Sequence, residues 1–171
     1  MSEPRVPAEP IPTDRLDLVP LRMEHSDEMA VVLSDPALHR FIGGTPDTPE
    51  GLRARYARLA AGSPEPGVSW CNWVLRLRAE SSLVGTVQAT ITGDDSAEIA
   101  WVVGTSWQGR GLASEAARGL VVWLRAVSVR TVVAHIHPDH HASAAVAAAA
   151  GLSVTEEEQE GERRWRLVLR P

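Results

Sequence analysis

Apolar and polar residues alternate along several stretches of the chain with the two-residue period of half-buried β-strands. The first stretch runs from Arg15 to Arg22, and its Pro20 favours a place at the edge of a sheet. The same pattern predicts further strands at residues 71–78, 83–91, 98–103, 129–136, 152–155 and 164–169. A charged turn from Glu156 to Arg163 joins the last two. We therefore expect one sheet of about seven strands.

Helical segments separate these strands. A helix is expected from Ser26, as its N-cap, to about Ser34, because Ser is a good N-cap residue. A second begins at Thr48-Pro49-Glu50 and ends at Gly62, since Pro suits the first helical position. A third helix is indicated by apolar residues at every fourth position, Leu112, Ala116, Leu120 and Leu124. A fourth, rich in Ala, runs from about His141 to Ala150. Strands and helices that alternate around one sheet indicate the α+β class.

The length and the ends of the chain predict a simple organisation. Residues 1–12 form a Pro-rich N-terminal arm with four prolines, and residues 13–171 form a single domain. The arm lacks the apolar centre of a signal peptide, and no apolar run approaches the roughly 18 residues of a membrane span. We therefore expect a cytoplasmic protein without a membrane partner. The net charge of -5 argues against nucleic acid as a partner.

The basic and sulfur-containing residues exclude several classes of enzyme. All 17 basic residues are Arg, and the chain contains no Lys. Schiff-base enzymes, pyridoxal-phosphate enzymes, Walker-loop enzymes and kinases of the usual kind all need a Lys amine or ammonium, so these are excluded. The single Cys71 excludes an internal disulfide and a multi-cysteine zinc site.

A glycine-containing loop lies between the expected strand 98–103 and the third helix. Its centre, Trp107-Gln108-Gly109-Arg110-Gly111-Leu112-Ala113, is rich in small residues, which leave backbone N–H groups free to face a ligand. Such a loop at the positive end of a helix binds phosphate. A purely structural turn is the alternative. The loop is not a Rossmann fingerprint, because the third Gly is missing.

The segment Gln108-Gly109-Arg110-Gly111-Leu112-Ala113 resembles the Gln/Arg-x-x-Gly-x-Gly/Ala signature of the GNAT superfamily of N-acetyltransferases. The chain is also similar to the RimJ/RimL-like branch in three other places, at residues 13–18, at 111–116, and from Ala142-Ser143 to the Ala-Gly-Leu that ends at Leu152. The order and spacing of these motifs agree from about residue 13 to residue 169.

This resemblance implies a GNAT-like fold and a binding site for acetyl-CoA. The fold is a mixed, mostly antiparallel sheet with helices on both faces and a splay between the fourth and fifth strands, here 98–103 and 129–136. The backbone of Val102 and Val103 would hold the pantetheine arm. His140 stands where family members often carry an Asn that contacts this arm. The pyrophosphate would lie on the loop and the start of the helix, at Gln108, Gly109, Arg110, Gly111, Leu112, Ala113 and Ser114.

The resemblance further implies direct transfer of an acetyl group, without a metal, to a primary amine. The acceptor would be a small molecule or a protein N-terminus, and the protein could work as a homodimer. Glu98 matches an acidic family position that deprotonates the amine, directly or through water, and Ser143 matches a position near the thioester sulfur. A base is useful because amines are mostly protonated at pH 7. The tyrosine acid of many relatives would fall at about Ala147, so Ser143 is the candidate acid.

Two alternatives remain at this point. A non-catalytic acyl-CoA-binding regulatory module would share the fold. The run His135-x-His137-x-Asp139-His140 resembles the zinc site of metallo-β-lactamase-type hydrolases, although that fold needs downstream ligands, and no His follows His141. Proton transfer by His137 or His140 and a simple solvated or capping role are the other possibilities for this cluster.

Three further features have an acceptor-related interpretation beside a structural one. The acidic run 156–162 is a solvated hairpin tip or attracts a cationic acceptor. Trp73 and Phe41 are core residues or line the acceptor pocket.

Overall fold

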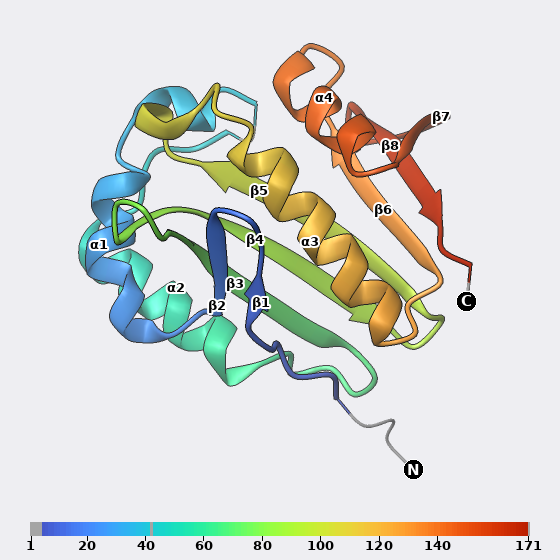
Figure 1. Cartoon of the computed structure of the whole chain (residues 1–171), viewed down its shortest axis with the longest axis horizontal. Helices are drawn as coiled ribbons and strands as arrows, with labels where there is room; N and C mark the ends of the chain where they lie inside the picture. The colour runs from blue at the N-terminus through green and yellow to red at the C-terminus, as the bar shows by residue number, and fades with distance from the viewer. Residues whose placement is uncertain (1–4, 42, 171) are drawn as a thin grey trace.

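A computed structural model describes residues 5–41 and 43–170 of the chain. Within these residues eight strands form one sheet in the order β1-β2-β3-β4-β5-β6-β8-β7 (Figure 1). Neighbouring strands are antiparallel except for the pair β5 and β6, which is parallel. The strands are β1 (Ile11–Pro12), β2 (Leu16–Pro20), β3 (Ser69–Leu77), β4 (Ser82–Thr92), β5 (Ser96–Val103), β6 (Thr131–Ile136), β7 (Ser153–Gln159) and β8 (Glu162–Val168). The predicted α+β class with a mostly antiparallel sheet is confirmed.

Helices cover both faces of this sheet (Figure 1). Helices α1 (Ser26–Val32) and α2 (Pro49–Ala61) pack on one face, and α3 (Leu112–Ala126) and α4 (His141–Ala149) pack on the other. Three short 3-10 helices, η1 (Met23–His25), η2 (Pro36–His39) and η3 (Thr105–Trp107), lie in the connections. We call the two faces the α1/α2 face and the α3/α4 face.

Alternation along the strands divides the apolar residues between two cores. On β3, Trp73 and Leu75 are buried beneath α3, whereas Val74 is buried with α1 and α2. The apolar stripe of α3 (Leu112, Ala116, Leu120, Leu124) is buried as its four-residue spacing predicts. At the start of α2 the Thr48 side chain accepts a hydrogen bond from the backbone N–H of Gly51 at 3.1 Å.

Several local expectations are corrected by the structure. Ser26 is the first residue of α1 and not its N-cap, because the 3-10 turn η1 leads straight into the helix. The strand that contains Pro20 is flanked by β1 and is therefore not the outermost strand. The charged segment 156–163 is mostly strand, because Glu160 and Gly161 both adopt positive φ (52° and 82°) and form a two-residue hairpin turn.

The Pro-rich arm packs against the domain over its described residues, 5–12; residues 1–4 lie outside the description. The backbone N–H of Val6 donates to the Ser69 hydroxyl at 2.9 Å, and Trp73 Nε1 donates to the carbonyl of Glu9 at 2.7 Å. The arm then pairs with β2 as strand β1. In the described part of the chain, no helix is long and apolar enough to cross a membrane.

The sheet opens between its two parallel strands. Ser96, Ala97 and Glu98 of β5 are in register with Thr131, Val132 and Val133 of β6. Past these pairs β5 continues to Val103 beside β4, while β6 continues to Ile136 beside β8. The two strands therefore separate toward their carboxyl ends, which is the predicted splay.

Candidate active site

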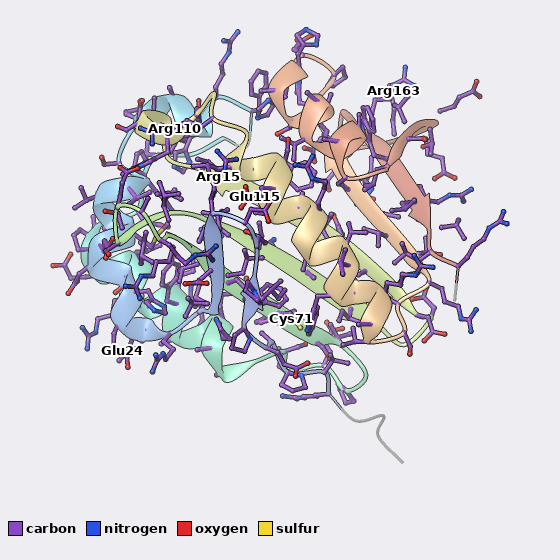
Figure 2. The ribbon with its side chains drawn as sticks, viewed as in Figure 1. Arg15, Glu24, Cys71, Arg110, Glu115 and Arg163 are labelled. Atoms are coloured by element: carbon purple, nitrogen blue, oxygen red, sulfur yellow. The ribbon has the colours of Figure 1, made fainter. Side chains whose placement is uncertain are left out.

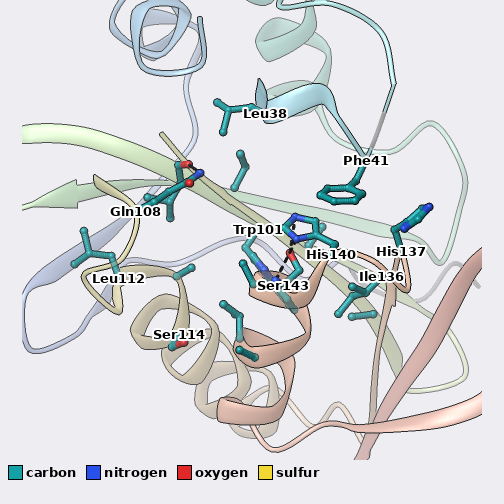
Figure 3. A pocket seen from close by; sticks show the side chains of 18 of the residues that line it. Leu38, Phe41, Trp101, Gln108, Leu112, Ser114, Ile136, His137, His140 and Ser143 are labelled. Atoms are coloured by element: carbon teal, nitrogen blue, oxygen red, sulfur yellow. Dashed lines mark hydrogen bonds between the residues drawn. The ribbon is translucent and has the colours of Figure 1, made fainter. Parts of the chain in front are cut away.

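A cavity of about 590 Å³ fills the splay, which is a size typical of ligand sites. Its walls come from the separated ends of β5 and β6, the glycine loop, the start of α3, and α4 (Figure 3). On the α1/α2 side it is bordered by Leu38 and Phe41, which follow α1 in the chain. The cavity therefore passes through the sheet and is open to both helical layers.

The glycine loop and the first turn of α3 form one end of this cavity. Gly109 and Gly111 have positive φ, 80° and 76°, a conformation that side chains rarely adopt. Gly111 is the N-cap of α3 and has no side chain to satisfy the first N–H groups of the helix. These groups belong to residues 112–114, which line the cavity. The predicted loop residues in the lining are Gln108, Gly109, Gly111, Leu112, Ala113 and Ser114.

Arg110 is not among the residues that line the cavity, and its guanidinium pairs with Glu80. Nη1 of Arg110 is 2.9 Å from the Glu80 carboxylate, on the turn between β3 and β4. Its carbonyl oxygen accepts a hydrogen bond from Arg15 Nη1 at 2.8 Å. A contact between Arg110 and a pyrophosphate would therefore require release of Glu80, and this role stays a prediction.

A half-buried carboxylate fixes the start of α3. Glu115 accepts hydrogen bonds from the hydroxyl of Thr13 (2.6 Å), the backbone N–H of Arg15 (2.8 Å) and Nε of Arg15 (2.7 Å). Figure 2 shows Arg15 and Glu115 together beside α3. Desolvation alone would raise the pKa of Glu115, but the hydrogen bonds from Thr13 and Arg15 and the Arg15 charge lower it overall. Arg15 thus ties both the helix and the loop to the segment before β2.

Of the two β5 residues predicted to hold the pantetheine arm, Val102 and Val103, only Val103 turns its backbone N–H and C=O toward the cavity. The N–H of Gly104 bonds to the carbonyl of Val84, and hydrogen-bonded pairs alternate along an antiparallel ladder. Val102, two residues earlier, therefore turns its N–H and C=O toward β4, and Val103 turns its own toward the splay. The Val103 carbonyl accepts a hydrogen bond from Gln108 Nε2 at 3.0 Å. The prediction for the Val102 backbone is corrected, although its side chain lines the cavity.

Trp101, and not Val102, turns its backbone groups toward the splay, by the same alternation. Its indole lines the cavity, and Nε1 is buried without a hydrogen-bond partner among the described residues. The sequence offered one signal for Trp101, its place two residues before Val103.

His140 and Ser143 form a hydrogen-bonded pair at the other end of the cavity. His140 is the N-cap of α4, where Nδ1 accepts from the backbone N–H of Ser143 at 3.3 Å. Its Nε2 is 3.1 Å from the Ser143 hydroxyl, and its ring stacks on Phe41 with centroids 4.4 Å apart (Figure 3). Desolvation, followed by the charges of His137 and His141, lowers the pKa of His140. The ring is therefore neutral at pH 7, with its proton on Nε2.

This tautomer sets the direction of the Ser143 hydroxyl. Nε2–H of His140 donates to Ser143 Oγ, so that the hydroxyl proton of Ser143 is free for a third group. Both side chains line the cavity. Ser143 can therefore donate a hydrogen bond to an atom within it.

Glu98 lies at the point where β5 and β6 begin to separate. Its carboxylate is 2.8 Å from Nδ1 of His135 on β6, and its side chain is 56% exposed. His135 is 13% exposed and belongs to the lining of the cavity, whereas Glu98 is not among the lining residues. The sequence pointed to Glu98 but gave no sign of its contact with His135.

The histidines of the predicted zinc motif do not converge. His135 faces Glu98, and Nδ1 of His137 accepts from the backbone N–H of Asp139 at 3.0 Å. His140 is engaged by Ser143. Across residues 5–41 and 43–170, no group of three His, Cys, Asp or Glu residues is arranged to hold a metal ion. The zinc interpretation thus has no support in the geometry.

Trp73 and Cys71 are core residues. Trp73 is fully buried and packs edge-on against Trp123, so it is not a pocket residue as one interpretation proposed. Cys71 is also fully buried, and burial raises the pKa of its thiol to about 11. Neither side chain is available for chemistry. Phe41, by contrast, lines the cavity.

A second cavity of about 130 Å³ lies on the α1/α2 face and shares Leu38 and Val102 with the first. Tyr56 of α2 lines it and is 3% exposed, and its hydroxyl has no hydrogen-bond partner among the described residues. Burial raises the pKa of Tyr56 to about 12, so the hydroxyl keeps its proton. Neutral polar side chains from β3 and β4 complete the floor: Asn72, Thr86 and Gln88.

Part of the acidic run is engaged by arginines of β8. Arg163 pairs with Glu158 at 3.3 Å, and Arg164 pairs with Glu157 at 3.4 Å, which accounts for two of the five glutamates between residues 156 and 162. Glu162 lines the larger cavity. The hairpin therefore presents Glu162 to the cavity.

Comparison with known proteins identifies the family. The model of the acetyltransferase (GNAT) domain matches residues 15–153. The chain belongs to the GNAT acetyltransferase family. This confirms the predicted family and enzyme class, and acetyl-CoA is accordingly its acetyl donor. No curated protein matches the sequence significantly.

Solved structures of GNAT proteins share the whole fold. A GNAT-family acetyltransferase from Bacillus anthracis has a TM-score of 0.77 at 19% identity, over 94% of this chain and 98% of that one. RimL, a ribosomal L7/L12 α-N-protein acetyltransferase in complex with coenzyme A, has a TM-score of 0.77 at 18% identity, over 94% of this chain and 98% of that one. AAC(6')-Ib in complex with paromomycin and acetyl-CoA has a TM-score of 0.74 at 16% identity, over 91% of this chain and 94% of that one. At these identities the likeness shows the fold.

Proposed function

We propose that this protein is an acetyl-CoA-dependent N-acetyltransferase that transfers the acetyl group directly to a primary amine in a ternary complex. The observation that carries this proposal is a single cavity that joins a phosphate-binding helix start, a free strand edge and a hydroxyl donor. The structural relatives in complex with coenzyme A or acetyl-CoA support it. The same features argue against a non-catalytic module, because nucleotide binding alone would not need the Ser143 pair or an opening to the other face.

The residues present fit acetyl-CoA from end to end. Unsatisfied N–H groups at residues 112–114 and the loop amides match a pyrophosphate, whose charge the helix dipole also favours. Backbone groups of Trp101 and Val103 match the amides of the pantetheine arm, as an added strand would. The thioester then lies near Ser143, in the first turn of α4.

The chemistry follows from what surrounds that position. The amine nitrogen attacks the thioester carbon, and a carbonyl oxygen that becomes negative is stabilised by backbone N–H groups of β5. The carbon–sulfur bond breaks, and the Ser143 hydroxyl donates its proton toward the departing sulfur. The proton of the amine passes to the pair formed by Glu98 and His135. No covalent enzyme intermediate is needed.

The acceptor approaches from the α1/α2 face. Phe41 and Leu38 border the opening there, and the smaller cavity with Tyr56 continues from it. We infer that the part of the acceptor beyond the amine enters this cavity. Its floor is neutral, since Asp47 at its edge is paired with Arg55 at 3.4 Å. The donor hydroxyl of Tyr56 suits an uncharged acceptor oxygen on a small amine or at a protein N-terminus.

Substitution of Gly111 tests the loop assignment. Gly111→Val places a branched side chain at a positive φ, where it distorts the N-cap of α3 and the N–H groups that meet the pyrophosphate. We expect acetyl-CoA affinity, measured by calorimetry, to fall at least about 100-fold, which corresponds to a loss of about 2.8 kcal/mol of binding free energy. Thiol release with a panel of primary amines then shows the transfer itself.

Gly161→Val is the matched control. Gly161 also has positive φ (82°) with open space around it, but it lies at the β7–β8 turn. This variant should lose stability yet bind acetyl-CoA with wild-type affinity. Unchanged affinity in Gly111→Val would remove the loop from the site, and acetyl-CoA binding without thiol release to any amine would favour the non-catalytic module.

A further inference from the structure

The pair formed by Glu98 and His135 closes the fork of the splay. Glu98 is the last β5 residue in register with β6, opposite Val133, and His135 follows two residues later on the same side of β6. Their 2.8 Å contact therefore spans the two strands where they part. Of this pair, His135 lines the cavity that fills the splay.

The contact determines which nitrogen of His135 carries a proton. An ionised carboxylate can only accept a hydrogen bond, so Nδ1 of His135 must donate to Glu98. In the neutral ring Nε2 then has a free lone pair. This Nε2 is buried and has no partner among the described residues, and such a group is costly unless a bound molecule engages it.

The surroundings of His135 leave that lone pair available. Arg164 lies opposite on β8 and pairs through Nη1 with Glu157; its Nε, also buried without a partner among the described residues, makes no hydrogen bond to His135. His137, next on the same side, engages the backbone of Asp139. Of the Glu98–His135 pair, only His135 lines the cavity in the described structure.

We propose that His135 is the general base that touches the acceptor amine, through Nε2, and that Glu98 is a positioning residue. This rests on the proposed acetyl transfer. The amine N–H proton moves to Nε2 while the nitrogen forms its bond to the thioester carbon and the electrons of the carbon–sulfur bond leave with sulfur. The imidazolium so formed is held by the Glu98 carboxylate. An imidazole is better matched to proton transfer near pH 7 than a carboxylate, with reference pKa values of about 6.5 and 4.3.

The first test compares variants with an amine found in the panel. His135→Gln should lower kcat by about 10²- to 10⁴-fold, the usual share of a general base, with acetyl-CoA affinity within twofold of wild type. His135→Ala should regain activity in proportion to added imidazole, which a structural role would not allow. Glu98→Gln should lower kcat less, about tenfold, because an amide oxygen still accepts from Nδ1–H. The control His141→Gln, at the exposed first residue of α4, should retain full activity.

The second test does not depend on activity. Nitrogen NMR of the free protein should show His135 as the Nδ1–H tautomer, and Glu98→Gln should weaken that preference. An Nε2–H tautomer, no imidazole rescue, or a larger loss of kcat in Glu98→Gln than in His135→Gln would each overturn the assignment. Failure of the wild-type protein with every amine would instead overturn acetyl transfer, and the NMR result would still decide the tautomer.

Discussion

His140 combines three roles in one side chain. It caps α4, contacts the Ser143 hydroxyl and stacks on Phe41. The capping role needs a neutral ring, because a protonated Nδ1 cannot accept from the Ser143 N–H. An Asn at this position could cap the helix but could not stack on Phe41.

The lowered pKa of His140 predicts an acid-sensitive site. Desolvation, with the charges of His137 and His141, holds this pKa below the ordinary histidine value of 6.5. The contribution of the ring to stability is therefore complete above pH 6.5 and is lost as the pH falls through the folded value. His140→Asn keeps a cap without titrating, so thermal unfolding at pH 7.5 and 5.5 should show a smaller acid loss than in wild type. Equal losses in both proteins would contradict this.

At the scale of elements, the start of α3 depends on one carboxylate. Glu115 lies in the first turn, where a negative charge is favourable, and it collects three hydrogen bonds from the segment before β2. Arg15 extends the same contact to the carbonyl of Arg110. The loop is thus held by residues about 95 to 100 positions away in the chain.

Glu115→Gln should destabilise the protein by about 1–3 kcal/mol at pH 7, because it weakens three hydrogen bonds to a half-buried carboxylate and removes the ion pair with Arg15. The pKa of Glu115 is lowered from 4.5, so its contribution is present above about pH 4.5 and is lost as the pH falls through the folded value. Urea unfolding should show the difference between variant and wild type shrinking at acid pH. The exposed Glu24→Gln should change stability little (Figure 2). A difference independent of pH would refute the role.

The place of the glycine loop at the start of α3 and in the wall of the cavity could be predicted, because it depends on six consecutive residues. The contact between Glu98 and His135 could not be predicted, since the two residues are 37 positions apart and meet only through the register of β5 with β6. The direction of the Val102 backbone has a similar cause: which backbone groups face the splay depends on the bond between Gly104 and Val84. The ion pair between Arg110 and Glu80 was also beyond prediction, because Glu80 lies on a turn 30 positions away.

At the scale of the whole molecule, the splay divides the sheet into two parts. Strands β1 to β5 form one part, and β6, β8 and β7 form the other (Figure 1). In the described residues three register pairs join β5 to β6, and contacts between α3 and α4 connect the parts on one face. A ligand in the splay would therefore supply contacts that the sheet itself omits.

Acetyl-CoA should accordingly stabilise the molecule and protect both edges of the splay. At 100 times its Kd, a ligand that binds only the folded state adds about 2.7 kcal/mol, which raises Tm by about 5–10 °C for a chain of this size. Hydrogen exchange should slow at Trp101 and Val103, in β6 and at the start of α4, while β2 and β3 change little. Adenosine diphosphate, which has the pyrophosphate without the pantetheine arm, should protect only the loop and the start of α3. If acetyl-CoA gave that same limited pattern, the pantetheine arm would not lie between β5 and β6.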